Sequence, residues 1–219
     1  MHRRTFLACL AVLPLSFATL SRAETFEQLA QEAERRKQAY LAQLRDLASK
    51  QPAEVFQNSL DIVLGPARAN KTVLVFTDFN CPYCRSLDSV LQQLAGPEVR
   101  FVLKWQTMMG DTSAYAAHYA LQVWRHRRSK YLDVHNALMQ APQPLSEYDI
   151  RNIARSTATY HLLPKDEALP QTLQNSVQLG EQLRVFATPT MLVGARMMGG
   201  MVDAETLAAA IQEWPMDTP

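Results

Sequence analysis

The chain has 219 residues, enough for one or two domains, and 47% of them are hydrophobic and 20% charged. This is an ordinary globular composition with ample core material. The formal net charge is only +1, so there is no electrostatic case for binding nucleic acid.

Residues 1–23 have the three parts of a secretory signal peptide. A basic segment at residues 2–4 precedes an apolar stretch at 6–20, and the small residues Ser21 and Ala23 predict cleavage after Ala23. The apolar stretch is shorter than the roughly 20 residues that a spanning helix needs. Residues 3–7 also resemble a twin-arginine signal, so Sec export and twin-arginine export both remain open. We therefore expect an exported, periplasmic protein.

Cleavage would change the charge and the cysteine count. Three arginines and no acids would leave, so the 22 basic residues become 19 against 21 acidic ones, a net charge of −2. Cys9 would leave as well, and only Cys81 and Cys84 would remain in a compartment where disulfides persist. A disulfide that closes so short a loop stabilises a fold little, which favours a redox role for this pair.

Residues 24–58 form a predicted N-terminal helical arm, whose helix spans 24–50 and ends before Pro52. Apolar residues recur every seven positions, with Lys37 as the one charged residue in the seam. The seam residues are Phe26, Ala30, Ala33, Lys37, Tyr40, Leu44 and Leu47. Two interpretations follow: the helix packs on its own domain, or residues 26–47 assemble a homo-oligomer.

The remaining residues, 59–219, are predicted to form one catalytic domain. Apolar runs predict strands at 61–66, 72–76 and 101–105, and a helix at 85–95 follows the sequence Cys81-Pro82-Tyr83-Cys84. Residues from about 112 to 184 have helical periodicity, and two strands and a last helix follow them. The helices expected in this part span 131–139, 146–157 with Ser146 as N-cap, 173–183, and 204–214 with Asp203 as N-cap; the strands span 190–193 and 196–198. The order predicts an α/β, thioredoxin-like fold with a helical insertion, preceded by the N-terminal helical arm.

The two cysteines carry the predicted chemistry. A Cys-x-x-Cys between a strand and a helix is the layout of a thioredoxin-like redox centre. The helix N-terminus favours a thiolate, so Cys81 is the candidate nucleophile and Cys84 the candidate resolving thiol of a redox-active disulfide. The alternative is a zinc half-site, but zinc needs two further ligands, and only histidines distant in sequence could supply them.

The dipeptide Thr188-Pro189 is the second candidate site. A proline at the start of a strand suits a cis peptide bond, and in thioredoxin-like folds such a proline faces the two cysteines. Thr188 would then offer its backbone to an extended substrate segment by β-augmentation. The alternative is an ordinary trans proline at the beginning of an edge strand.

Three segments resemble bacterial periplasmic thiol-disulfide oxidoreductases of the DsbA-like and DsbC/DsbG-like groups. They are residues 75–84, residues 131–139 and Thr188-Pro189, and the pattern is most similar to ScsC-like or Com1-like members. The resemblance covers residues 61–214 and implies a protein disulfide isomerase or reductase, with a DsbA-like oxidase as the alternative. It also implies cysteine-containing protein substrates bound at Pro82, Tyr83, Thr188 and Pro189, no dissociable cofactor, and a membrane redox partner.

The sequence departs from the family pattern at two positions. Many relatives have a buried acid six residues before the first cysteine, where this chain has Val75. Asp78 is closer to the cysteines, and we interpret it as a capping or turn residue rather than as the proton acceptor. Tyr83 replaces the histidine of strong oxidants, which favours a less oxidising pair.

The methionines allow a rival function. Met108, Met109, Met191, Met197, Met198 and Met201 could bind Cu(I) together with the cysteines. The alternatives are that they fill gaps in the core or form an adaptable peptide-binding rim.

Overall fold

A computed structural model describes residues 26–50, 55, 58–165, 168–194 and 196–213, so the predicted signal peptide lies outside the described residues. The chain divides into two compact units, residues 1–40 and 41–219. Helix α1 (Phe26–Lys50) confirms the helix predicted for the arm, and its residues up to 40 are all that is described of the first unit. Within the described residues, no helix is both long and apolar enough to cross a membrane.

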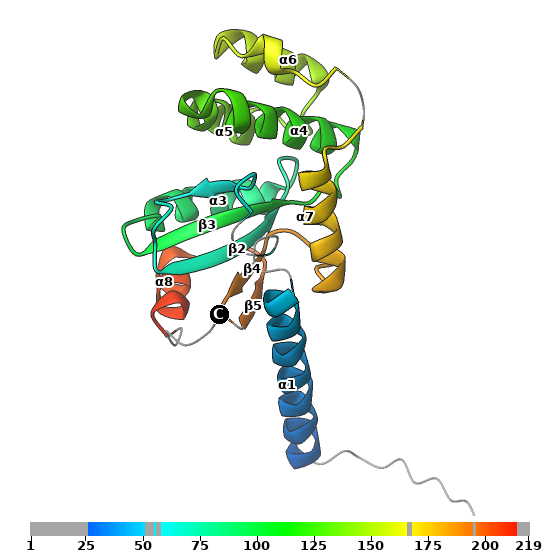
Figure 1. Ribbon diagram of the computed structural model, residues 1–219, viewed down its shortest axis with the longest axis vertical. Helices are drawn as coiled ribbons and strands as arrows, with labels where there is room; N and C mark the ends of the chain where they lie inside the picture. The colour runs from blue at the N-terminus through cyan, green and yellow to red at the C-terminus, as the bar shows by residue number, and fades with distance from the viewer. Residues whose placement is uncertain (1–25, 51–54, 56–57, 166–167, 195, 214–219) are drawn as a thin grey trace, which may run out of the picture. The chain divides into compact units, whose positions relative to one another are not determined.

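A five-stranded mixed sheet organises the second unit (Figure 1). The strand order is β1-β3-β2-β4-β5; β2 and β3 are parallel, and every other pair is antiparallel. The strands are β1 (Ile62–Leu64), β2 (Lys71–Thr77), β3 (Val99–Trp105), β4 (Thr190–Val193) and β5 (Arg196–Gly199). All five predicted strands are therefore present, with ends that differ by a few residues at most.

Strand β2 is the centre of the sheet and is buried on both faces. Val73 and Val75 belong to the main hydrophobic core, while Leu74 and Phe76 alternate with them, and all four are fully buried. A continuous apolar run is what a central strand covered on both sides requires. Helix α3 (Pro82–Leu94) connects β2 to its parallel neighbour β3, so the Cys-x-x-Cys lies at the C-terminal end of the central strand.

The predicted helical insertion is confirmed between β3 and β4. It contains α4 (Asp111–His126), α5 (Tyr131–Gln140), α6 (Glu147–Ser156) and α7 (Gln171–Gln182), with short 3-10 turns at Arg128–Lys130 and Tyr160–Leu162. Helices α4, α5 and α6 gather in one block on one side of the sheet (Figure 1). The last helix, α8 (Ala204–Gln212), packs on α3, and the predicted Trp214 end lies outside the described residues.

The predicted caps explain where two of the helices begin. The Ser146 hydroxyl accepts the Asp149 N–H, and the Asp149 carboxylate accepts the Ser146 N–H in return, which completes a capping box. Asp203 caps α8 by accepting the Thr206 N–H at 2.7 Å. Gly110 precedes α4 at φ +98°, a conformation that glycine adopts without strain.

One buried ion pair fastens the edge of the sheet. Lys104 on β3 donates from Nζ to Oδ2 of Asp61, the residue before β1, at 2.5 Å, and both side chains are almost fully buried. Burial raises the pKa of Asp61, and the nearby ammonium group opposes that rise. The pair therefore joins β1 to β3 at a charged contact that strand periodicity does not predict.

Candidate active site

Cys81 is the N-cap of helix α3. Its backbone is extended, and its sulfur accepts the Cys84 N–H at 3.3 Å. The helix begins at Pro82 rather than at the predicted Arg85, because proline is favoured in the first helical turn, where its missing N–H costs nothing. The positive end of the helix dipole therefore points at the Cys81 sulfur.

The predicted site residues come together although more than 100 positions separate them in sequence. Both cysteines are free thiols with exposed fractions of 3% and 2%. The Cys81 thiol donates to the carbonyl oxygen of Thr188 at 3.2 Å. The Thr188–Pro189 bond is cis, as predicted, and the Gly200 N–H donates to the Pro189 carbonyl at 2.8 Å. Cys81, Cys84 and the proline loop thus form one site at the end of β2.

Cys84 is as buried as Cys81, and the hydroxyl groups of Thr77 and Thr188 lie near its sulfur. Burial is the largest of the causes that raise the pKa of Cys84 to about 12, and its hydrogen bond with Cys81 acts in the same direction. Hydrogen bonds from the Thr188 and Thr77 side chains and the Asp78 backbone partly oppose that rise. The sequence did not predict Thr77 as a site residue. Its position as the last residue of β2, the strand that leads to the cysteines, could have indicated that role.

Asp78 is a turn residue, as we interpreted it from the sequence. Its fully buried carboxylate accepts the Asn80 N–H at 2.8 Å and the Ser113 hydroxyl at 2.7 Å through Oδ1. Oδ2 accepts the backbone N–H groups of Met108 at 3.1 Å and Met109 at 3.3 Å. Four donors occupy the carboxylate, so it binds the active-site turn to the segment before α4 rather than serving as a free base.

Polar side chains next to the cysteines bind the helical insertion. Oδ1 of Asn80 accepts the Leu145 N–H at 2.8 Å, and Nδ2 donates to the Ser113 hydroxyl at 3.1 Å. Arg85 donates to the backbone carbonyl of Ala141 in the same connection between α5 and α6. The sequence did not single out Asn80 or Arg85, because their partners lie roughly 30 to 65 positions further along the chain.

An exposed apolar rim borders the site. Tyr83 is 65% exposed, Phe186 82%, and Met108, Met109 and Met201 are each about half exposed. Each lies on a segment that forms the site or contacts it. Tyr83 lies between the cysteines, Phe186 precedes Thr188, and Met201 follows Gly200.

The described residues offer little to a bound metal ion. They contain no group of three or more His, Cys, Asp and Glu side chains able to hold one. Two of the methionines proposed for Cu(I), Met191 and Met198, belong to the hydrophobic core.

Comparisons with known proteins agree with this geometry. Residues 72–212 match the family model of the DSBA-like thioredoxin domain. The catalytic domain of Proteus mirabilis ScsC is 28% identical, with a TM-score of 0.72 over 78% of this chain and 97% of that one. A thioredoxin-like oxidoreductase from Silicibacter pomeroyi DSS-3 is 30% identical, with a TM-score of 0.67 over 73% and 95%.

A curated relative, disulfide bond formation protein D of Bacillus subtilis strain 168, is 24% identical in an alignment 172 residues long that covers 69% of this chain and 75% of that protein. The family model covers more than half of the chain and confirms the resemblance found in the sequence. The chain therefore belongs to the DSBA-like thioredoxin domain family and is a thiol-disulfide oxidoreductase.

Proposed function

We propose that this protein is exported to the periplasm and exchanges disulfides with cysteine-containing proteins, acting as an isomerase or reductase. Cys81 is the nucleophile in this proposal, and Cys84 is the resolving thiol. Among the structures similar to this chain is a periplasmic thioredoxin-like protein from Salmonella enterica serovar Typhimurium, which is 28% identical over 74% of this chain and 93% of its own, with a TM-score of 0.67. Export predicts that the mature N-terminus is Glu24, which sequencing of the exported protein tests.

The reaction needs no group beyond the two sulfurs. The Cys81 thiolate attacks a substrate disulfide, so one substrate sulfur leaves as a thiolate and takes up a proton. The Cys84 thiol then loses its proton and attacks the Cys81 sulfur of the mixed disulfide. The second substrate thiol is released, the substrate has gained two electrons, and the Cys81–Cys84 disulfide has formed. A membrane redox partner would return the pair to the dithiol.

The proline loop and the rim support a protein as substrate. The Thr188 carbonyl already accepts a hydrogen bond from Cys81, so a peptide held at Thr188 and Pro189 by β-augmentation would lie against the reacting sulfur. Pro82 and Tyr83, which follow Cys81 directly, would contribute further contacts to the peptide. Exposed aromatic and methionine side chains suit varied peptide sequences, because they adapt to different apolar partners.

The structural observation that carries the isomerase or reductase proposal is the exposed seam of α1. In the first unit, Phe26 is 88% exposed, and Ala30, Ala33 and Lys37 on the same seam are exposed as well. An apolar heptad stripe left in solvent is typical of a helix that associates with copies of itself. An oligomer would bring several active sites together around one substrate, which suits disulfide rearrangement.

Sedimentation of the protein beginning at residue 24 tests this proposal. We expect an oligomer at micromolar concentration, and we expect Ala33→Lys, in the seam, to dissociate it. Gln31→Lys adds the same charge at an exposed position outside the seam and should leave the oligomer intact. A monomeric parent protein would contradict the oligomeric isomerase and favour the DsbA-like oxidase.

The redox potential of the cysteine pair distinguishes an isomerase or reductase from an oxidase, independently of the sedimentation result. Equilibration with glutathione should give a value near or below about −200 mV for an isomerase or reductase, whereas a value near about −120 mV would indicate an oxidase. We expect the lower range, because Tyr83 stands where strong oxidants have histidine.

A further inference from the structure

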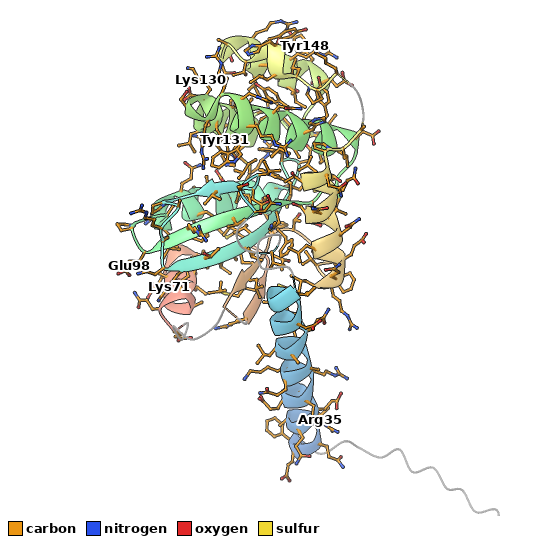
Figure 2. All side chains as sticks on the ribbon, viewed as in Figure 1. Arg35, Lys71, Glu98, Lys130, Tyr131 and Tyr148 are labelled. Carbon is orange, nitrogen blue, oxygen red and sulfur yellow. The ribbon has the colours of Figure 1, made fainter. Side chains whose placement is uncertain are left out.

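A buried hydrogen-bonded cluster lies behind the cysteines and takes no part in the reaction described above. Asp88 of α3 binds His135 of α5 through Oδ1 and Nε2 at 2.7 Å, and Nδ1 of His135 lies 2.9 Å from the Tyr131 hydroxyl. The exposed fractions of Asp88, His135 and Tyr131 are 5%, 0% and 1%. Figure 2 shows Tyr131 between the helical block and the sheet, whereas Lys130 and Tyr148 lie at the outside of the block.

The hydrogen bonds are consistent with the following arrangement of protons. Burial and the Asp88 charge raise the pKa of Tyr131 well above its ordinary value, so its hydroxyl keeps its proton and can donate to His135 Nδ1. His135 then carries its own proton on Nε2 and donates it to the Asp88 carboxylate. The second carboxylate oxygen accepts the Gln92 side-chain amide at 2.7 Å. Each member of the chain from Tyr131 to Asp88 is therefore satisfied in one arrangement, which keeps the histidine ring from rotating.

His135 also contacts the segment that leads into Cys81. Phe79, two residues before Cys81, stacks on Trp105 with ring centroids 3.9 Å apart. The His135 ring meets both edge-on, at 5.8 Å from Phe79 and 6.2 Å from Trp105. One immobile ring thus supports the active-site segment before Cys81 through packing and α3 after Cys84 through a hydrogen bond.

We propose that Asp88, His135 and Tyr131 form a positioning triad through which the helical insertion holds the resolving thiol, Cys84, in line with Cys81. Cys84 and Asp88 are four residues apart on the buried face of α3, so an anchor at Asp88 fixes the helix one turn beyond Cys84. Cys84 must move onto the Cys81 sulfur to resolve a mixed disulfide, so the placement of its helix acts directly on that step. The proposal rests on the resolving role that the proposed function gives to Cys84.

The test compares His135→Leu, which removes both hydrogen bonds, with His135→Gln, whose Nε2 can still donate to Asp88. Stopped-flow measurements with a peptide disulfide give separate rates for mixed-disulfide formation and for its resolution by Cys84. We expect His135→Leu to slow resolution about tenfold, because a small misplacement of a reacting group is costly. Attack by Cys81 should stay within about twofold of the parent rate, and His135→Gln should restore most of the resolution rate.

Further variants keep the proposal testable. Asp133→Asn changes an exposed residue of the same helix and should alter neither rate. If His135→Leu does not fold, Tyr131→Phe decides, because it removes only the hydroxyl and should slow resolution about threefold. Unchanged resolution in the folded variant, equal slowing of both steps, or a His135→Gln variant as slow as His135→Leu would each overturn the triad.

Discussion

The raised pKa of Cys84 gives the sharpest prediction for the reaction. Burial is its largest cause, and it lifts the pKa from the ordinary 9.0 to about 12. At pH 8 the thiolate fraction falls from about one in ten to about one in ten thousand, so Cys84 should react with an alkylating agent about a thousandfold more slowly than an ordinary thiol. In the reduced protein Cys84 should therefore be a poor nucleophile toward reagents in solution.

A variant with a single thiol measures this directly. Cys81→Ala removes the other sulfur, and with it the smaller contribution that Cys81 makes to the shift, while the burial of Cys84 remains. We expect the alkylation rate of the folded variant to rise with pH at far more alkaline values than that of the same variant unfolded in urea. Equal midpoints in the folded and unfolded variant would refute the reasoning, because they would mean that the fold does not suppress the Cys84 thiolate.

Three other substitutions test the surroundings of the site. Thr77→Val removes a hydrogen bond that lowers the pKa of Cys84, so Cys84 should be alkylated more slowly still and mixed disulfides should persist longer, as acid-quenched gels would show. Asp78→Asn places an amide donor where four donors meet the carboxylate, so it should lower the free energy of unfolding by about 2–3 kcal/mol. An unchanged midpoint of urea unfolding would contradict the hydrogen bonds assigned to Asp78. Lys104→Met leaves the Asp61 carboxylate buried without its cation and should lower the free energy of unfolding by about 3–5 kcal/mol. The double variant with Asp61→Leu should regain most of that stability.

Local patterns predicted most of the fold. The strands at the centre of the sheet are apolar runs because they are buried on both faces. Helix α6 begins directly after Ser146, because the hydroxyl of this N-cap residue satisfies a free N–H of the first turn. The start of α3 was predicted three residues late. Cys81 acts as its cap through sulfur, a role that cap preferences drawn from oxygen side chains do not predict.

The sequence by itself determined which residues can do the chemistry: two cysteines at a strand–helix junction, and a proline before a later strand. Only the tertiary structure decided how reactive the two cysteines are. Val75 indicated that the usual buried acid is absent, but not that Thr77 and Thr188 would offer hydroxyl groups to Cys84. Asp88 and His135 are 47 positions apart, and their bond exists because the insertion packs on α3. Burial and long-range contacts control reactivity here, and both arise only when distant segments pack together.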